Sequence, residues 1–264
     1  MNVNADGSPV NGRISQLAFG AVLLVAVFWL AISIGKPRPK FAPMPDFGSY
    51  EQVADKKAAF FDYLTPIVEY YNAQILAERK RLKRISATLA KGETLSWVDN
   101  IWLEGLARKY AVEWSDDGLD SMVRVLDRRV DIIPTPLVLI QAAKESSWGQ
   151  SRFAVEAHNL FGLWCFDEGC GIEPEQRPAG ATHEVQRFDT VDDAVRSYFR
   201  NLNTHDGYLR LRQIRQRLRE NNQPVTAKAL VEGLSLYSER REAYVKELKS
   251  MIAQYHWFQR TRVE

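Results

Sequence analysis

One segment near the amino terminus constrains this chain more than any other. The run from Leu17 to Gly35, LAFGAVLLVAVFWLAISIG, contains no charged residue. As a helix it would rise roughly 28 Å, which is close to the thickness of the apolar core of a bilayer. It has no polar stripe, and the SIGKP sequence at its exit is a poor signal-peptide cleavage site. We therefore expect residues 1–35 to hold a tail and an uncleaved transmembrane anchor.

The residues around this run give conflicting indications of topology. Arg13 precedes the run, whereas Lys36, Arg38 and Lys40 follow it. Taken alone, the positive-inside tendency favours a cytoplasmic position for everything after the anchor. Residues 36–48 are rich in proline, which favours extended chain, so we expect a semi-rigid stalk there.

The rest of the chain predicts a mainly helical fold. Apolar side chains recur at spacings of three and four, as on one helix face, at Phe60, Leu64, Ile67, Tyr71 and Ile75. Pro66 predicts either a kink or the start of a second helix. We expect residues 49–131 to form a helical N-terminal region packed on a second domain, residues 132–264. Further helices are expected at 95–110, 119–130, 208–220, 226–234 and 238–255, and a capping box at Thr190 begins another.

Charge and cysteine content narrow the class of protein. The formal net charge is +2, so the sequence lacks the basic excess typical of nucleic-acid binding. The charged runs at 78–84 and 210–219 are each interpreted as a solvated helix face or as a contact with anionic polymer. Cys165 and Cys170 lack the second pair of a structural zinc site, but they could form a local disulfide in an oxidising compartment. We expect no metal and no organic cofactor.

Glu145 is the strongest candidate for chemistry. Thr135 as N-cap and Gly149 as terminator predict a helix at residues 136–148, with Glu145 in its last turn. Its neighbours include Ala142, Ala143 and Trp148, and a partly apolar setting raises the pKa of a carboxyl. Glycoside hydrolysis needs such an acid, together with a second carboxylate or a group of the substrate. The alternative is an exposed glutamate without a catalytic role.

Two linked motifs resemble a known enzyme family. QAAKESSWGQS at 141–151, followed by NLFG at 159–162, resembles glycoside hydrolase family 73. Phe188, Ala194 and Tyr198 match a later part of the family pattern, and the resemblance covers about residues 132–255. It implies a lysozyme-like α+β fold, mainly α with a small β-hairpin lobe, and endo-β-N-acetylglucosaminidase activity.

The resemblance also implies roles for individual residues. Glu145 corresponds to the general acid, and Glu184 in the lobe is the nearest match to a second acidic residue. Asp189 or the N-acetyl group of the substrate could take that second role instead. The expected substrate-binding residues are Tyr198, Tyr237, Asn159 and Gly162. The two tyrosines could equally be core residues, and Asn159 and Gly162 fit a turn.

The expected function is hydrolysis of the β-1,4 bond after N-acetylglucosamine in peptidoglycan glycan strands. Such a substrate requires the catalytic domain to lie in the periplasm or outside the cell. With the anchor, we therefore expect a single-pass inner-membrane protein, although the charges around the anchor favour the opposite orientation. A lytic transglycosylase using the same glutamate is the first alternative. A non-catalytic module that binds or assembles cell-wall glycan is the second. The sequence indicates no nucleic-acid partner and identifies no protein partner.

Overall fold

The structure is a computed structural model that describes residues 38–113, 118–175, 177 and 180–261, with side chains to Tyr255. Residues 43–264 form one compact unit, which holds every helix and strand that the structure describes. Within the described ranges, no helix is both long and apolar enough to cross a bilayer. The predicted anchor at 17–35 lies outside these ranges.

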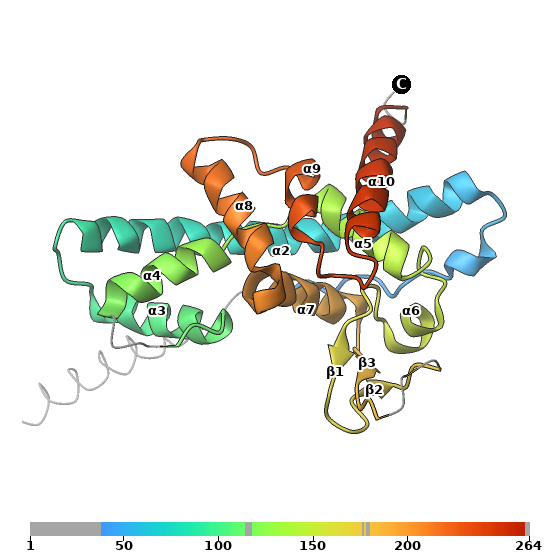
Figure 1. The fold of residues 1–264 in the computed structure, drawn as a ribbon, viewed down its shortest axis with the longest axis horizontal. Helices are drawn as coiled ribbons and strands as arrows, with labels where there is room; N and C mark the ends of the chain where they lie inside the picture. The colour runs from blue at the N-terminus through green and yellow to red at the C-terminus, as the bar shows by residue number, and fades with distance from the viewer. Residues whose placement is uncertain (1–37, 114–117, 176, 178–179, 262–264) are drawn as a thin grey trace, which may run out of the picture. The chain divides into compact units, whose positions relative to one another are not determined.

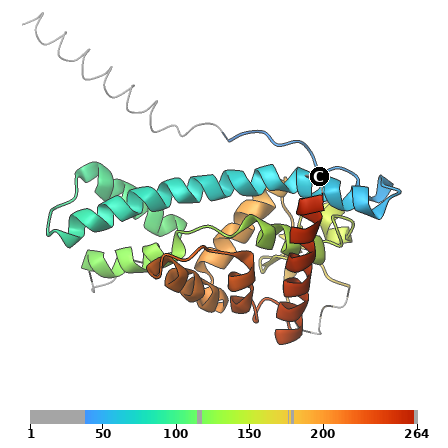
Figure 2. The same cartoon turned by 90° about the horizontal axis from the view of Figure 1, so that it is seen from above.

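A long helix, α2, runs through this unit, and shorter helices pack along it (Figures 1 and 2). α4 lies beside the carboxyl-terminal half of α2, and α5 crosses its amino-terminal half (Figure 1). The elements of this first half are η1 (Phe47–Ser49), α2 (Val53–Ala90), α3 (Trp97–Lys109), α4 (Gly118–Arg129), α5 (Thr135–Glu145) and α6 (Arg152–Ala157). Part of the expected stalk belongs to this unit, because Phe47 is buried.

The apolar face predicted for α2 is confirmed. Its five members are all buried against the other helices. Pro66 lies inside this one continuous helix, so the alternative of a second helix starting there is wrong. A proline lacks an amide hydrogen, and inside a helix it leaves the carbonyl four residues earlier without its donor. Burial of the surrounding apolar face compensates for that loss.

The charged run at 78–84 connects helices rather than forming only a solvated face. Glu78 accepts hydrogen bonds from Lys109 Nζ (2.6 Å) and from the Tyr110 hydroxyl (2.8 Å), both at the end of α3. Arg81 pairs with Asp99 of α3 at 2.9 Å. The predicted alternatives for this run are therefore wrong for these two residues, whose charges join α2 to α3.

A small β lobe interrupts the helices. Its strands are β1 (Trp164–Cys165), β2 (Gly171–Ile172) and β3 (Glu184–Gln186). They form an antiparallel sheet in the order β1-β3-β2, in which Val185 pairs with Trp164 on one side and Ile172 on the other. The predicted hairpin is therefore a three-stranded sheet with β3 in the middle. A disulfide joins Cys165 to Cys170 with a Cα–Cα distance of 6.2 Å.

The chain after the lobe is helical again. The capping box is confirmed, because Thr190 Oγ1 accepts from the Asp193 amide (3.2 Å) and donates to the Asp193 carboxylate (2.8 Å). The elements are α7 (Val191–Thr204), η2 (Asp206–Tyr208), α8 (Leu209–Glu220), α9 (Ala227–Leu230), η3 (Val231–Gly233) and α10 (Glu242–Thr261). The single helix predicted at 226–234 is thus divided into α9 and η3.

The basic run on α8 corrects another prediction. Arg212 and Arg215 are each only 1% exposed, so for them a solvated face or a polymer contact is wrong. Arg215 donates to four backbone carbonyls at and after the end of α4, and Arg212 donates to two around the end of α7. These carbonyls lack intrahelical donors, and the buried guanidinium groups supply them. The buried arginines of α8 therefore join this helix to the ends of α4 and α7.

Candidate active site

The carboxyl end of α5 positions Glu145. The helix begins at Thr135, with Pro134 as N-cap, and it ends at Glu145 rather than at Trp148 as predicted. A carboxylate at this end of a helix meets the negative pole of the helix dipole, which favours the protonated form. A helix that ends at Glu145 therefore favours the protonated carboxyl more than a helix that ended at Trp148 would.

A tight turn stops the helix and fixes the position of Glu145. Ser147, Trp148 and Gly149 have φ values of 52°, 62° and 78°, so the chain turns in the left-handed region. The Ser146 hydroxyl donates to the Ala142 carbonyl (2.6 Å) and accepts from the Gly149 amide (2.8 Å). Two residues with side chains at positive φ are costly, and packing must hold them there.

The packing comes from α2. The Trp148 ring lies edge-on to Phe60 and Phe61, with centroid distances of 5.8 and 5.3 Å. Lys57 Nζ lies 4.9 Å from the centroid of the same ring. Trp148 is thus a packing residue. The N-terminal helical region therefore supports the turn that carries Glu145.

A chain of hydrogen bonds ends at the Glu145 carboxylate. The Tyr198 hydroxyl donates to Gln141 Oε1 (2.5 Å), and Gln141 Nε2 donates to the Tyr244 oxygen (3.0 Å). The Tyr244 hydroxyl then donates to Glu145 Oε1 at 2.8 Å. Gln141 is completely buried, so its amide makes these two bonds in place of bonds to water. Tyr244 thereby orients one oxygen of Glu145.

The surroundings of Glu145 favour its protonated form. Burial raises the pKa of the Glu145 carboxyl, and the hydrogen bond from Tyr244 and the charge of Lys144 offset only part of that rise. Lys144 Nζ is itself paired with Glu247 at 2.7 Å, which weakens its effect on Glu145. A half-buried carboxyl with a raised pKa can keep a proton to donate.

The two tyrosines expected to bind sugar are engaged with the protein. Tyr198 is fully buried and stacks on Phe161 at 4.1 Å, so a direct sugar contact is wrong for Tyr198. Tyr237 is half-buried, and its hydroxyl donates to the Phe161 carbonyl (2.8 Å). Its ring stacks on Tyr244 with a centroid distance of 5.7 Å. Tyr237 thus contacts Tyr244 directly, and Tyr198 is linked to Tyr244 through Gln141.

Asn159 and Gly162 shape the loop that follows α6. Asn159 is buried, donates to the carbonyls of Leu163 and Gln186, and accepts from the amides of Phe161 and Leu163. Its role as a substrate ligand is therefore wrong, because these bonds occupy its amide group. Gly162 is exposed with φ of +64°, a conformation that favours glycine. The turn interpretation fits both residues.

Glu184 has surroundings opposite to those of Glu145. Its two oxygens accept hydrogen bonds from the backbone amides of Gly169 (3.1 Å) and Gly171 (2.7 Å), which lower its pKa. The carboxylate thus stabilises the turn between Cys165 and Cys170, which the disulfide also closes. Its ligand atoms lie within 4.8 Å of both cysteine sulfurs, but the disulfide removes the thiolates that a metal would need. Asp189 is exposed on the segment between β3 and α7.

Comparison with known proteins fits this geometry. Residues 121–257 match the glucosaminidase family, described as mannosyl-glycoprotein endo-beta-N-acetylglucosaminidase. The chain belongs to this family. Protein bax of Escherichia coli (strain K12) is 34% identical over 214 residues, which cover 80% of this chain and 74% of that protein. No solved structure matches the chain. The family predicted from the motifs is confirmed, and the chain is a protein of the glycosidase class.

A groove lies beside the lobe of this glucosaminidase. It has a volume of about 570 Å³ and is lined by Trp164 and Gln186 of the lobe, by Arg200 and Asn201 of α7, and by residues near the ends of α3 and α4. Asn201 hydrogen-bonds to Tyr208. The Tyr208 ring lies 5.8 Å from that of Tyr237, which stacks on the partner of Glu145. These contacts form a path of packed side chains from Asn201 to Tyr244, whose hydroxyl bonds to Glu145, although Glu145 itself does not line the groove.

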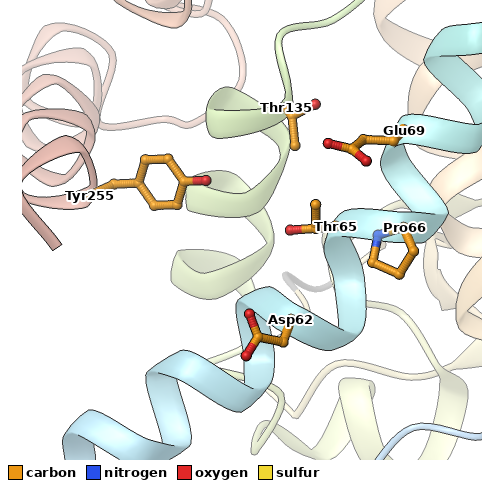
Figure 3. A pocket seen from close by; sticks show the side chains of 6 residues that line it. All are labelled: Asp62, Thr65, Pro66, Glu69, Thr135 and Tyr255. Atoms are coloured by element: carbon orange, nitrogen blue, oxygen red, sulfur yellow. The ribbon is translucent and has the colours of Figure 1, made fainter. Parts of the chain in front are cut away.

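Sequence reasoning missed the groove residues Arg129, Arg200 and Asn201. None of the three belongs to a recognised motif, although Arg200 and Asn201 lie just after Tyr198, and only the fold brings α4 and α7 to one groove. A second pocket, of about 420 Å³, lies between α2, the start of α5 and α10, and its lining includes Asp62, Glu69 and Tyr255 (Figure 3). Like the groove, it is lined by none of the residues predicted for the site.

Proposed function

We propose that this glucosaminidase hydrolyses the β-1,4 bond after N-acetylglucosamine in peptidoglycan, with Glu145 as the general acid. The observation that carries the proposal is the half-buried Glu145 carboxyl at the end of α5, whose pKa burial raises. Such a group keeps its proton until the glycosidic oxygen arrives, and then donates it to the leaving sugar. The family match supports the reaction class.

Tyr244 determines which oxygen of Glu145 carries the proton. Its hydroxyl donates to Oε1, so the proton resides on Oε2, and that oxygen is left to face the sugar. As the leaving oxygen takes the proton, a carboxylate develops that the Tyr244 hydrogen bond stabilises. The glycosidic bond breaks to the leaving oxygen, and water completes the hydrolysis at the sugar carbon.

The second participant is Glu184, Asp189 or the N-acetyl group of the substrate. Both Glu184 oxygens are occupied by backbone amides, and this weakens Glu184 as a base or nucleophile. We therefore expect Glu184→Gln to lower kcat less than Glu145→Gln does. A loss as large as that of Glu145→Gln would instead assign Glu184 a direct part in the chemistry.

The test uses the full-length protein and purified cell-wall sacculi. Glu145→Gln keeps an acceptor for Tyr244 but cannot donate the proton, so kcat should fall roughly 100- to 10,000-fold. Glu156→Gln, an exposed glutamate on α6, is the matched control and should behave as wild type. Equal activity of wild type and Glu145→Gln would refute the proposed acid.

Product analysis separates the alternatives. Reduction of released fragments with borohydride should label a new N-acetylglucosamine end. An anhydromuramyl end would identify a lytic transglycosylase. Binding to sacculi without any release by the wild type would leave only the non-catalytic module.

The proposed location is the outer face of the inner membrane, with residues 1–35 as the anchor. The apolar run at 17–35 and the cell-wall substrate support this location. A reporter fused after Pro45 should be active only outside the cytoplasm. A cytoplasmic signal would exclude access of the domain to peptidoglycan.

A further inference from the structure

The groove beside the lobe has an aromatic wall open to solvent. Trp164 is 55% exposed, although it belongs to a strand. His183 covers one face of its ring, at 4.0 Å between centroids and 19° between planes. The exposed area therefore includes the opposite ring face. An exposed indole face packs well against the C–H surface of a sugar ring, because it is broad, rigid and apolar.

The same groove holds an excess of positive charge. Arg129 donates to the carbonyls of Tyr110 and Ala111, which are neutral and leave its charge uncancelled. Asp206, which also lines the groove, lies 4.0 Å from Arg129, and its side chain is 95% exposed, so solvent screens the pair. Arg200 is exposed, and no ion pair of its guanidinium is present within the described part of the chain.

A ligand for this groove needs an apolar ring face and a negative group on one molecule. Arginine presents a planar fork of donors that fits a carboxylate, and it is always charged. A neutral sugar polymer would use Trp164 but leave the guanidinium groups unmatched. A carboxylate-bearing sugar would use both.

We propose that this groove is a subsite for the carboxylate-bearing sugars of the glycan strand, with Trp164 as the stacking surface and Arg200 and Arg129 as the carboxylate partners. This inference rests on the proposed function, because it names which sugar of the cell-wall polymer the groove receives. It gives the enzyme a physical basis for preferring peptide-free glycan strands, whose sugar carboxyls are ionised, over a neutral β-1,4-linked N-acetylglucosamine polymer. Arg129 belongs to α4, so the helices before α5 complete the subsite.

The experiment compares two soluble substrates with the same bond type. One is peptide-free glycan strands, whose sugar carboxyls are ionised, and the other is neutral chito-oligosaccharides. Arg200→Gln should raise KM for glycan strands by about fivefold and leave KM for chito-oligosaccharides unchanged, since one solvated charge pair is lost. Arg200→Lys should restore part of the affinity for glycan strands. Trp164→Ala should weaken both substrates, by about tenfold, because stacking does not depend on charge.

The matched control is Arg196→Gln. Arg196 lies one turn earlier on α7 and is paired with Asp193 at 2.8 Å, and it does not line the groove. It should leave both KM values unchanged. An equal rise for both substrates with Arg200→Gln, or no rise for either, would overturn the subsite.

A binding measurement keeps this inference separate from the proposed function. Glu145→Gln protein is titrated with glycan strands whose carboxyls are either intact or converted to amides. Tighter binding of the intact strands, abolished by a second substitution Arg200→Gln, supports the subsite even when the wild type cleaves neither substrate. Equal binding of intact and amidated strands contradicts it even when the enzyme is active.

Discussion

Glu145 at the end of α5 and Glu184 in the β lobe have opposite surroundings. Burial raises the pKa of Glu145, whereas the backbone amides of Gly169 and Gly171 lower the pKa of Glu184. A pair of carboxyls whose pKa values are pushed apart can hold one proton and one charge at the same pH. At the residue scale, the acid of the proposed reaction is thus distinguished by its environment alone.

The pH dependence follows from Glu145. Activity needs the protonated carboxyl, so kcat should fall as pH rises through the raised pKa of Glu145. We expect the alkaline limb of the kcat–pH profile to lie above the ordinary value of a glutamate side chain. A limb at or below that ordinary value would contradict the assignment. The profile of Glu156→Gln should overlay that of the wild type.

The same shift has a consequence for stability. A raised folded-state pKa contributes stability that is fully present below the unfolded pKa and lost as pH rises through the folded pKa. Glu145→Gln removes the cost of burying a charge at neutral pH. Its thermal midpoint at pH 7 should equal or exceed that of the wild type, and the difference should shrink in acid.

Tyr244 is a positioning residue whose effect can be isolated. Tyr244→Phe removes the hydrogen bond that lowers the pKa of Glu145, so the alkaline limb of kcat should move upward. It also leaves the buried Gln141 amide without its acceptor, at a cost of about 1–3 kcal/mol in the free energy of unfolding. Tyr50→Phe, at an exposed position, is the control. A lower kcat with an unmoved limb would assign Tyr244 a purely structural role.

At the element scale, the end of α5 shows where sequence patterns stop being informative. Thr135 and Gly149 predicted the existence and start of this helix within a residue or two. They could not predict its end, because Ser147 and Trp148 take positive φ to bring the Trp148 ring against Phe60 and Phe61. That contact joins segments far apart in the chain. Periodicity records only local spacing, so it cannot report such packing.

The β lobe was predicted less completely for a similar reason. Its strands have only two or three residues each, too few for an alternating pattern to register. The residue types favoured a hairpin around Glu184, but pairing of β3 with both β1 and β2 depends on contacts across the sheet. The disulfide could be named as a candidate from the spacing of its cysteines, and only the fold places them within bonding distance.

The disulfide and Glu184 together should hold this lobe in place. We expect Cys165→Ser with Cys170→Ser to lower the free energy of unfolding by about 2 kcal/mol, as for a short closed loop. Amide hydrogen exchange should accelerate across residues 163–187 and stay unchanged in α2 and α5. Peptidoglycan hydrolysis should fall in parallel. Unchanged exchange in the lobe would show that Glu184 and the strand pairing suffice.

At the scale of the whole molecule, Asp131 connects α2 with α8. It is 2% exposed, and Arg79 of α2 and Arg219 of α8 pair with it at 3.6 and 2.8 Å. Burial alone would raise the pKa of Asp131, but the hydrogen bond from Arg219 and the charges of Arg215 and Arg79 hold it below its usual range. A single carboxylate thus neutralises basic residues from distant helices.

Asp131→Asn should therefore destabilise the whole unit. The substitution leaves buried guanidinium groups without their counter-charge, and we expect a loss of about 3–5 kcal/mol in urea denaturation at pH 7. Because its folded pKa is lowered, the contribution of Asp131 is present above the unfolded pKa and lost as pH falls through the folded pKa. The difference from the wild type should shrink in acid. Asp120→Asn, exposed on α4, should match the wild type at both pH values.

This network also explains which global features escaped prediction. The family, the helical character and the face of α2 could be predicted because motifs and apolar periodicity are local. The burial of Arg212 and Arg215 could not, since an arginine-rich helix has the pattern of a solvated one. Their acceptors are backbone carbonyls at and after the ends of α4 and α7. Every sequence has such carbonyls, so no residue pattern marks them.

The close approach of Phe47 to Gly149 restricts how this protein can evolve. A Cβ at position 149 would lie 2.4 Å from a carbon of the Phe47 ring. A larger residue at 149 is thus excluded while the ring is present, and loss of the ring would open a void beneath the Glu145 turn. The two positions are expected to covary, so a chimera that exchanges the segment around 47 between relatives must inherit position 149 from the same parent.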